Sequence, residues 1–326
     1  MPRIFVARMI PERGLKILWD ALGKQSVIVY EYDQIIPRGD LLAGVRKADA
    51  LLPILTDTID AAVMDAAGPQ LKIIANYAVG YNNIDVAAAT ARRIPVTNTP
   101  GVLTETTADL TWALLLATAR RLSESERLLR ASKWSGWGPM MFLGMDVHGK
   151  TLGIFGMGRI GVAVARRAIG FKMRVLYTSL TRLESGLERE LNAAPVDKAT
   201  LLAESDIVSI HCPLSAETRH AFGAAEFKAM KKTACLINTS RGPVVDEEAL
   251  ADALKSGEIF AAGLDVYEDE PKVHPKLLHC DNAVLIPHLG SASHETRSRM
   301  AEIAATNIVA RLNGEPPPNC VNPEVL

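Results

Sequence analysis

The chain has 326 residues, of which 48% are hydrophobic and 22% are charged, and its formal net charge is −1. This length allows two domains with a core each, and the near-zero charge gives no sign of a nucleic-acid or membrane surface. The N-terminus lacks the features of a signal peptide, and the four cysteines have no CxxC spacing. We therefore expect a cytoplasmic protein with reduced thiols.

Short β-branched runs alternate with helical patterns along most of the chain, which is typical of parallel sheets covered by helices. Strands are predicted in the first hundred residues at 4–7, 27–30, 50–55 and 72–76. Helices are predicted between them at 12–22 and 61–67. A single long helix is then expected from Glu105 to Arg130, because apolar side chains follow one broad side of it.

A second alternating series begins at Lys150. It predicts strands at 152–155, 174–177, 207–210, 234–238, 261–264 and 284–286. Asp246 is expected to cap a helix that ends before Gly257, and a last helix is expected over 293–312. The two series predict an α/β protein of two doubly wound parallel-sheet domains, Rossmann- or flavodoxin-like, with the active site in the cleft between them.

The stretch GMGRIG lies between the strand at 152–155 and a predicted helix, in the order of a dinucleotide-binding fingerprint. Gly156 would allow the tight turn, Gly158 the approach of the backbone to a pyrophosphate, and Gly161 the close packing of helix on strand. The phosphates would then lie at the helix N-terminus, where unpaired N–H groups favour an anion. A structural glycine turn is the alternative, which the surrounding strand–helix–strand order disfavours.

The next strand ends in YTSLTR, where an NAD site usually carries a carboxylate for the ribose. No acid occurs here before Glu184. Hydroxyls of Ser179 and Thr181 and the guanidinium of Arg182 could instead bind the additional phosphate of NADP. We therefore predict a preference for NADPH, with NADH also accepted if Arg182 points to solvent.

Three later stretches follow predicted strands: NTSRGP, LDVYEDEP and IPHLGS. They bring Arg241, Glu270 and His288 to one rim of the sheet, where ligands bind in open α/β folds. Arg241 could orient a substrate carboxylate, and His288 could donate a proton. Glu270 would hold the imidazole and favour its protonated form, although Glu268 is a rival for that role.

Other candidate residues point to no second chemistry. His211 also follows a strand, and we expect it to be mostly structural, with a possible backbone contact to the cofactor. The remaining histidines have no metal-ligand spacing, and no signature of a covalent nucleophile is present.

Taken together, these motifs resemble those of the D-isomer-specific 2-hydroxyacid dehydrogenases over essentially the full length. The resemblance also includes YAVGYNNID at 77–85. Within the family the chain is most similar to the glyoxylate/hydroxypyruvate reductases, through WSGWGP at 134–139 and IPERGL at 10–15. The family implies reduction of glyoxylate to glycolate or hydroxypyruvate to D-glycerate, with Arg241, Glu270 and His288 as the catalytic residues.

The resemblance also implies a domain organisation. Residues 1–99 and 290–326 would form a discontinuous substrate-binding domain, and residues 100–289 a dinucleotide-binding domain. Substrate contacts are expected from Leu55, Val79 and Gly80 in addition to Arg241 and His288. Further cofactor contacts are expected at Arg159, Ile160, Leu180, Cys212, Pro213, Thr239, Ser240, Asp265, His288 and Gly290. Asp265 is also expected to hold the catalytic residues in place without contacting the substrate itself.

Two alternatives to this function stay open: another D-2-hydroxyacid substrate, and a nicotinamide-sensing corepressor on the same fold. The family further implies a homodimer. Trp134, Trp137, Met140, Met141 and Phe142 crowd a connector where a lone domain has little reason for so much apolar surface. The alternative is that these side chains cap the core of their own domain.

Overall fold

The computed structural model describes all 326 residues, and the chain divides into two compact units. Unit 1 comprises Met1–Leu103 and Ser291–Leu326, and unit 2 comprises Thr104–Gly290. The substrate-binding and dinucleotide-binding roles expected for the two parts of the chain stay predictions. Neither unit contains a helix with the length and apolarity needed to cross a bilayer.

Unit 1 is built on a five-stranded parallel sheet with the strand order β2-β1-β3-β4-β5. Its strands are short: β1 (Ile4–Val6), β2 (Val27–Val29), β3 (Ala50–Leu52), β4 (Ile73–Ala75) and β5 (Val96–Thr97). The strand predicted at 50–55 stops at Leu52, because Pro53 has no N–H to continue the ladder. The strand β5 was not predicted.

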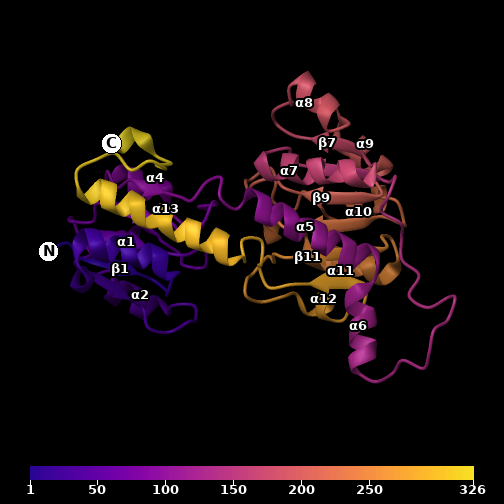
Figure 1. Cartoon of the computed structure of the whole chain (residues 1–326), viewed down its shortest axis with the longest axis horizontal. Helices are drawn as coiled ribbons and strands as arrows, with labels where there is room; N and C mark the ends of the chain where they lie inside the picture. The colour runs from indigo at the N-terminus through magenta and orange to yellow at the C-terminus, as the bar shows by residue number, and fades with distance from the viewer. The chain divides into compact units, whose positions relative to one another are not determined.

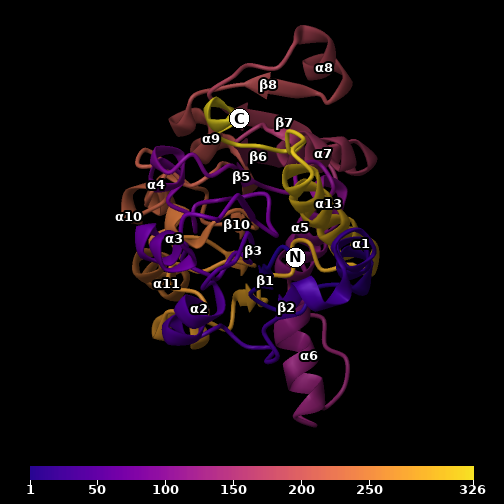
Figure 2. The same ribbon diagram turned by 90° about the vertical axis from the view of Figure 1, so that its left-hand side faces the viewer.

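Helices cover both faces of this sheet (Figure 2). Ile4 and Val6 pack against α1 (Glu12–Leu22) and α13 (His294–Leu312). Phe5, which points to the opposite face, belongs to a second core with α2 (Arg38–Gly44), α3 (Ala61–Ala67) and α4 (Val86–Ala91). Alternation along β1 therefore builds two cores, as expected for a sheet buried on both faces.

Unit 2 is built on a seven-stranded parallel sheet with the order β12-β11-β10-β9-β6-β7-β8. Its strands are β6 (Thr151–Phe155), β7 (Arg174–Thr178), β8 (Ala193–Pro195), β9 (Ile207–Ile210), β10 (Cys235–Asn238), β11 (Ala261–Leu264) and β12 (Ala283–Leu285). The strand β8 was not predicted. In both sheets the strand order reverses beside the first strand, which is where doubly wound folds bind ligands. The predicted fold class, α/β with two parallel sheets, is confirmed.

The helices of unit 2 form two layers. One core contains side chains of α5 (Thr104–Ala119) and α7 (Arg159–Ala168), which lie on the same face of the sheet (Figure 1). The other core contains side chains of α9 (Lys198–Glu204), α10 (Ala224–Ala229), α11 (Glu247–Ser256) and α12 (Pro275–Leu278). As predicted, Asp246 caps α11: its carboxylate accepts from Ala249 N at 2.9 Å, and Gly257 follows with φ 70°.

The prediction of one long helix from Glu105 to Arg130 is wrong, because two helices, α5 and α6 (Leu122–Arg130), occupy this stretch. Arg121 between them lies in the left-handed region, with φ 54°. The segment before β6 then binds the C-terminal end of α5: Met145 N donates to the carbonyl of Ala119, the last residue of α5, at 2.9 Å. A long-range contact thus ends a helix whose sequence pattern continues.

The packing of α1 on α13 depends on Gly14. A Cβ at this position would lie 2.6 Å from both Cβ and O of Ala301. Alanine usually stabilises a helix relative to glycine, but overpacking a tight interface costs about 1–3 kcal/mol. We therefore expect Gly14→Ala to lower the free energy of unfolding by about that amount in a denaturant titration. Gly39→Ala in α2, where nothing lies within 4 Å of the added Cβ, is the matched control and should be neutral or stabilising.

Candidate active site

At two glycines of the stretch that joins β6 to α7, a side chain would clash with neighbouring backbone atoms. A Cβ at Gly156 would lie 2.4 Å from Cys212 N, and the residue has φ 102°, which favours glycine. A Cβ at Gly161 would lie 2.4 Å from Gly156 O. The loop after β9 therefore lies directly against the turn, and α7 packs closely on it.

The third glycine faces open space. Gly158 caps α7, and no atom lies within 4 Å of a Cβ added there. Gly158 and Arg159 are exposed, and Ile160 is partly exposed. A cradle closed at Gly156 and Gly161 but open at the helix N-terminus fits a pyrophosphate, whose charge the first N–H groups of the helix would bind.

The turn after β7 is tied down by an acid from α8 (Ser185–Glu190). Arg182 Nε and Nη2 donate to the two carboxylate oxygens of Glu188 at 2.9 and 3.1 Å. The buried Tyr177 hydroxyl donates to Glu188 Oε1 at 2.7 Å and accepts from Leu183 N at 3.0 Å. The hydrogen bonds from Arg182 and from Tyr177 hold the pKa of Glu188 below its ordinary value.

Arg182 is therefore neither an isolated cation nor a side chain that merely points to solvent. Its side chain is 69% exposed, although one edge of the guanidinium is engaged by Glu188. Ser179 is half-buried, whereas Leu180 and Thr181 are exposed. Sequence reasoning missed Glu188, because its position on a following helix carries no signal of contact with the turn.

The loop after β10 carries Arg241 and is held by Asn238. Asn238 Oδ1 accepts from Ser240 N at 3.0 Å, and its Nδ2 donates to Arg241 O at 3.0 Å. Ser240 Oγ donates to Cys212 O, and the Thr239 hydroxyl lies 2.8 Å from that of Thr111 on α5. Thr239 and Ser240 thus hold the loop in place from two neighbouring elements.

The next residue brings two loops into contact. A Cβ at Gly242 would lie 1.8 Å from the carbonyl carbon of Tyr267, so only glycine fits where the loop after β11 crosses. This crossing puts the Arg241 guanidinium within electrostatic range of Glu270. Burial lowers the pKa of Arg241, and the charge of Glu270 acts in the opposite direction.

Glu270 and His288 form a hydrogen-bonded pair. His288 Nδ1 lies 2.8 Å from Glu270 Oε2, and Glu270 Oε1 accepts from Tyr267 N at 3.1 Å. Burial acts to raise the pKa of Glu270, but the hydrogen bond and charge of His288, with Arg241, hold it below its ordinary value. The carboxylate is thus ionised at neutral pH, and the second imidazole nitrogen, Nε2, stays available for chemistry.

His288 lies in the left-handed region, with φ 54°, which is uncommon for a side chain of this size. The backbone around it is held by Asp265, which is fully buried. Asp265 Oδ1 accepts from Leu289 N at 2.5 Å and Oδ2 from Gly290 N at 2.8 Å. Burial raises the pKa of Asp265 to about 6. With both oxygens engaged, Asp265 positions the turn that carries His288, and its expected contact with a cofactor stays a prediction.

The rival acid, Glu268, has other partners. It pairs with His220 Nε2, and it exchanges hydrogen bonds with the backbone and side chain of Glu247. His211 Nε2 lies 2.8 Å from Ser209 Oγ, and burial lowers its pKa to about 3, which agrees with a structural role. Burial raises the pKa of the Cys212 thiol to about 11, so this thiol is not a nucleophile at neutral pH.

The expected substrate residues of unit 1 lie at the carboxyl edge of its own sheet. Leu55 follows β3 and is 37% exposed. Val79 and Gly80 follow β4 and are partly exposed, and their N–H groups donate to no group of the protein. Successive free N–H groups of this kind can bind an anion.

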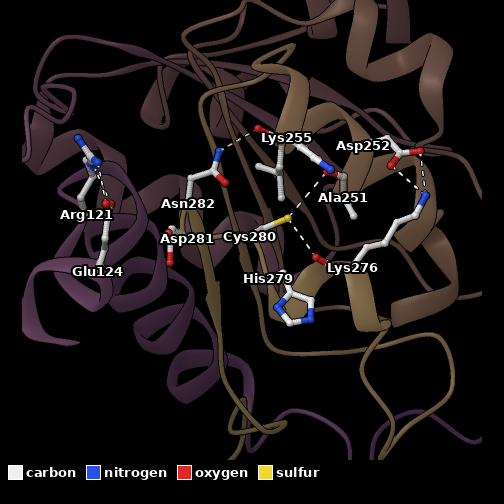
Figure 3. Close-up of a pocket in the computed structure, with 11 residues that line it drawn as sticks. Arg121, Glu124, Ala251, Asp252, Lys255, Lys276, His279, Cys280, Asp281 and Asn282 are labelled. Carbon is white, nitrogen blue, oxygen red and sulfur yellow. Dashed lines mark hydrogen bonds and ion pairs between the residues drawn. The ribbon is translucent and has the colours of Figure 1, made fainter. Parts of the chain in front are cut away.

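A separate pocket in unit 2, of about 600 Å³, contains none of these residues (Figure 3). Its walls include Asp281 and Asn282, which directly precede β12, so it lies toward the opposite edge of the sheet from His288. Two of its cations are already paired: Arg121 contacts Glu124, and Lys276 contacts Asp252. This pocket is not part of the candidate active site.

Comparison with known proteins gives one answer. Residues 112–290 match the family model for the NAD binding domain of D-isomer specific 2-hydroxyacid dehydrogenases. A glyoxylate reductase of Korarchaeum cryptofilum is 54% identical over 328 aligned residues, which cover all of this chain and 97% of that protein.

Solved structures of similar fold point to the same family. A protein of Thermus thermophilus has a TM-score of 0.90 and 45% identity, over 98% of this chain and 99% of that one. An NADPH-dependent glyoxylate/hydroxypyruvate reductase of Sinorhizobium meliloti, solved with NADP and malonate, has a TM-score of 0.85 and 34% identity. That match covers 99% of this chain and 97% of the other. The glycine cradle, the Glu270–His288 pair and these full-length matches together show that the chain belongs to the D-isomer specific 2-hydroxyacid dehydrogenase family of NAD(P)-dependent enzymes.

Proposed function

We propose that this enzyme reduces glyoxylate to glycolate and hydroxypyruvate to D-glycerate, with NADPH as its preferred reductant. The observation that carries the proposal is the hydrogen bond between Glu270 and His288, with the charge of the half-buried Arg241 close enough to act on Glu270. It combines a proton donor with a binding group for carboxylate. The names of the Korarchaeum and Sinorhizobium relatives support the choice of substrates.

The reaction divides between the cofactor and His288. When bound, the nicotinamide supplies a hydride to the carbonyl carbon of the keto acid. Protonated His288 gives its proton from Nε2 to the carbonyl oxygen, because Nδ1 is held by Glu270. The ionised carboxylate stabilises the imidazolium before the transfer and holds the ring in one orientation afterwards.

Arg241 binds the substrate carboxylate in this proposal. Its planar guanidinium suits a carboxylate, and its partial burial strengthens the attraction by lowering the local dielectric. In unit 1, the free N–H groups of Val79 and Gly80 are suited to the same charge, and Leu55 supplies an apolar wall. Unit 1 would thus be the substrate-binding domain and unit 2 the dinucleotide-binding domain.

The preference for NADPH rests on the turn after β7. No carboxylate lies among Ser179, Leu180 and Thr181 to repel a ribose phosphate, and Arg182 supplies a positive charge. Glu188 neutralises part of that charge. We therefore expect a preference of about tenfold in kcat/KM, equivalent to ~1.4 kcal/mol, with NADH still accepted.

We also propose a homodimer. Trp134, Trp137 and Met140 are 54%, 83% and 78% exposed, so these side chains do not cap the core of their own unit. They lie on the irregular segment between α6 and β6 (Figure 1). A second copy of the chain would bury this apolar surface. A dimeric mass is expected in light scattering, and a monomeric mass at micromolar concentration would contradict the proposal.

His288→Ala should lower kcat by orders of magnitude for every keto acid, because the proton donor is lost. Binding of NADPH should be unchanged, as measured by fluorescence titration. The measurement uses glyoxylate, hydroxypyruvate, pyruvate and bulkier 2-keto acids with the unmodified enzyme and the variant. Near-normal turnover in the variant would rule out His288 as the donor, and no turnover of any keto acid by the unmodified enzyme would rule out the proposed activity.

Glu270→Gln is a milder change than His288→Ala, because it keeps the proton donor and removes only the charge of its partner. The amide oxygen can still accept from Nδ1, but no negative charge remains to favour the protonated imidazole. Reduction needs the protonated form, so kcat should fall, though less than in His288→Ala, while binding of NADPH in a fluorescence titration stays unchanged. Weaker binding of NADPH would instead indicate damage to the site.

The cofactor preference is tested by Ser179→Asp combined with Arg182→Ala. The new carboxylate would accept from the ribose hydroxyls and repel the phosphate, so the ratio of kcat/KM for NADPH over NADH should invert. Thr200→Ala, in the first turn of α9, serves as an unrelated control. Equal kcat/KM for the two cofactors in the unmodified enzyme would show that the missing acid has no effect.

A further inference from the structure

The segment after β4 in unit 1 has three successive carbonyls that are all held by hydrogen bonds. Ala78 O accepts from Thr99 N at 2.9 Å. Val79 O accepts from Asn98 Nδ2 at 2.8 Å, and Gly80 O accepts from Asn76 Nδ2 at 2.9 Å. The orientation of each peptide plane in this segment is therefore set by its neighbours.

This arrangement determines where the N–H groups point. In a trans peptide the N–H of the next residue is directed opposite to the carbonyl. The carbonyls of Ala78 and Val79 accept from adjacent residues, Thr99 and Asn98. The N–H groups of Val79 and Gly80 consequently both point away from residues 98–99, and neither donates to another group of the protein.

The two peptide planes are not held equally well. The plane between Ala78 and Val79 is fixed by a backbone N–H, that of Thr99, which follows β5. The plane between Val79 and Gly80 is fixed through its carbonyl by one side chain, Asn98. A peptide that precedes glycine can flip at little cost, because glycine accepts both signs of φ. The Asn98 amide is thus what prevents the Gly80 N–H from turning away.

We propose that Asn98 is a positioning residue that aims the Gly80 N–H at the carboxylate of the substrate. The inference rests on the proposed function, in which the Val79 and Gly80 amides bind that carboxylate. Asn98 does not touch the substrate and acts through the peptide plane. Its own backbone is anchored, since Asn98 N donates to Asn319 O at 3.3 Å and Thr99 is bound to Ala78.

Two substitutions test this role. Asn98→Leu keeps the approximate volume but removes the donor, and Asn98→Asp keeps the shape but places a negative charge beside Val79 O. In both, the KM for the keto acid should rise about tenfold to a hundredfold, as expected for losing a hydrogen bond to a charged group. The KM for NADPH should stay within about twofold, because the cofactor cradle belongs to unit 2.

A matched control separates positioning from stability. Asn322 is buried in the same unit, donates to Ile94 O at 3.0 Å and accepts from Val96 N at 2.8 Å. Asn322→Leu should lower the melting temperature without changing the KM for the keto acid. If Asn98→Leu lowered stability as this control does and left the KM unchanged, the role of Asn98 would be structural only.

A binding measurement keeps the test independent of turnover. Calorimetric titration of the NADP-bound enzyme with oxalate, a small dicarboxylate, should give at least tenfold weaker binding for Asn98→Leu than for the unmodified chain. Equal affinities would overturn the inference. If the unmodified enzyme binds oxalate but reduces no keto acid, the proposed function fails, while the comparison of affinities still decides the role of Asn98.

Discussion

The buried carboxylate of Asp265 is the interaction on which the geometry of the candidate active site depends. Asp265 directly follows β11. Its backbone N–H donates to Asn238 O at 2.9 Å, and its backbone carbonyl accepts from His288 N at 2.9 Å. Its side chain holds Leu289 and Gly290. Burial of a carboxylate is costly unless its oxygens accept hydrogen bonds, and here two backbone N–H groups supply them. The same bonds hold His288 in an uncommon backbone conformation beside Glu270.

The parallel sheet explains why such distant residues meet. Strands β9, β10, β11 and β12 are neighbours and run in the same direction, so the loops after them emerge at one edge. Glycines let these loops approach more closely than other residues allow: Gly156 against Cys212, and Gly242 against Tyr267. Arg241, Glu270 and His288 need no long side-chain reach, because the backbone has already brought them together.

Each functional carboxylate or cation described here has a partner of opposite charge. Glu270 is shared between His288 and the field of Arg241, whereas Glu268 is committed to His220 and Glu247. The turn after β7 follows the same rule, since Glu188 is shared between Arg182 and Tyr177. An arginine that is already paired can still meet a phosphate with its other edge, but with a weaker net charge. This is the physical reason for expecting a moderate rather than an absolute cofactor preference.

The sequence by itself determined the two alternating series, most strand positions, several of the helices and the glycine turn at 156–161, because periodicity, capping and backbone freedom are local properties. It also placed Arg241, Glu270 and His288 just after strands. Only the tertiary structure decided that Glu270 rather than Glu268 contacts His288, that Glu188 engages Arg182, and that the helix pattern breaks at Arg121. The orientation of the Gly80 amide by Asn98 belongs to the same group. These outcomes depend on contacts between segments far apart in the chain, and no local pattern specifies which of two neighbouring side chains will find its partner.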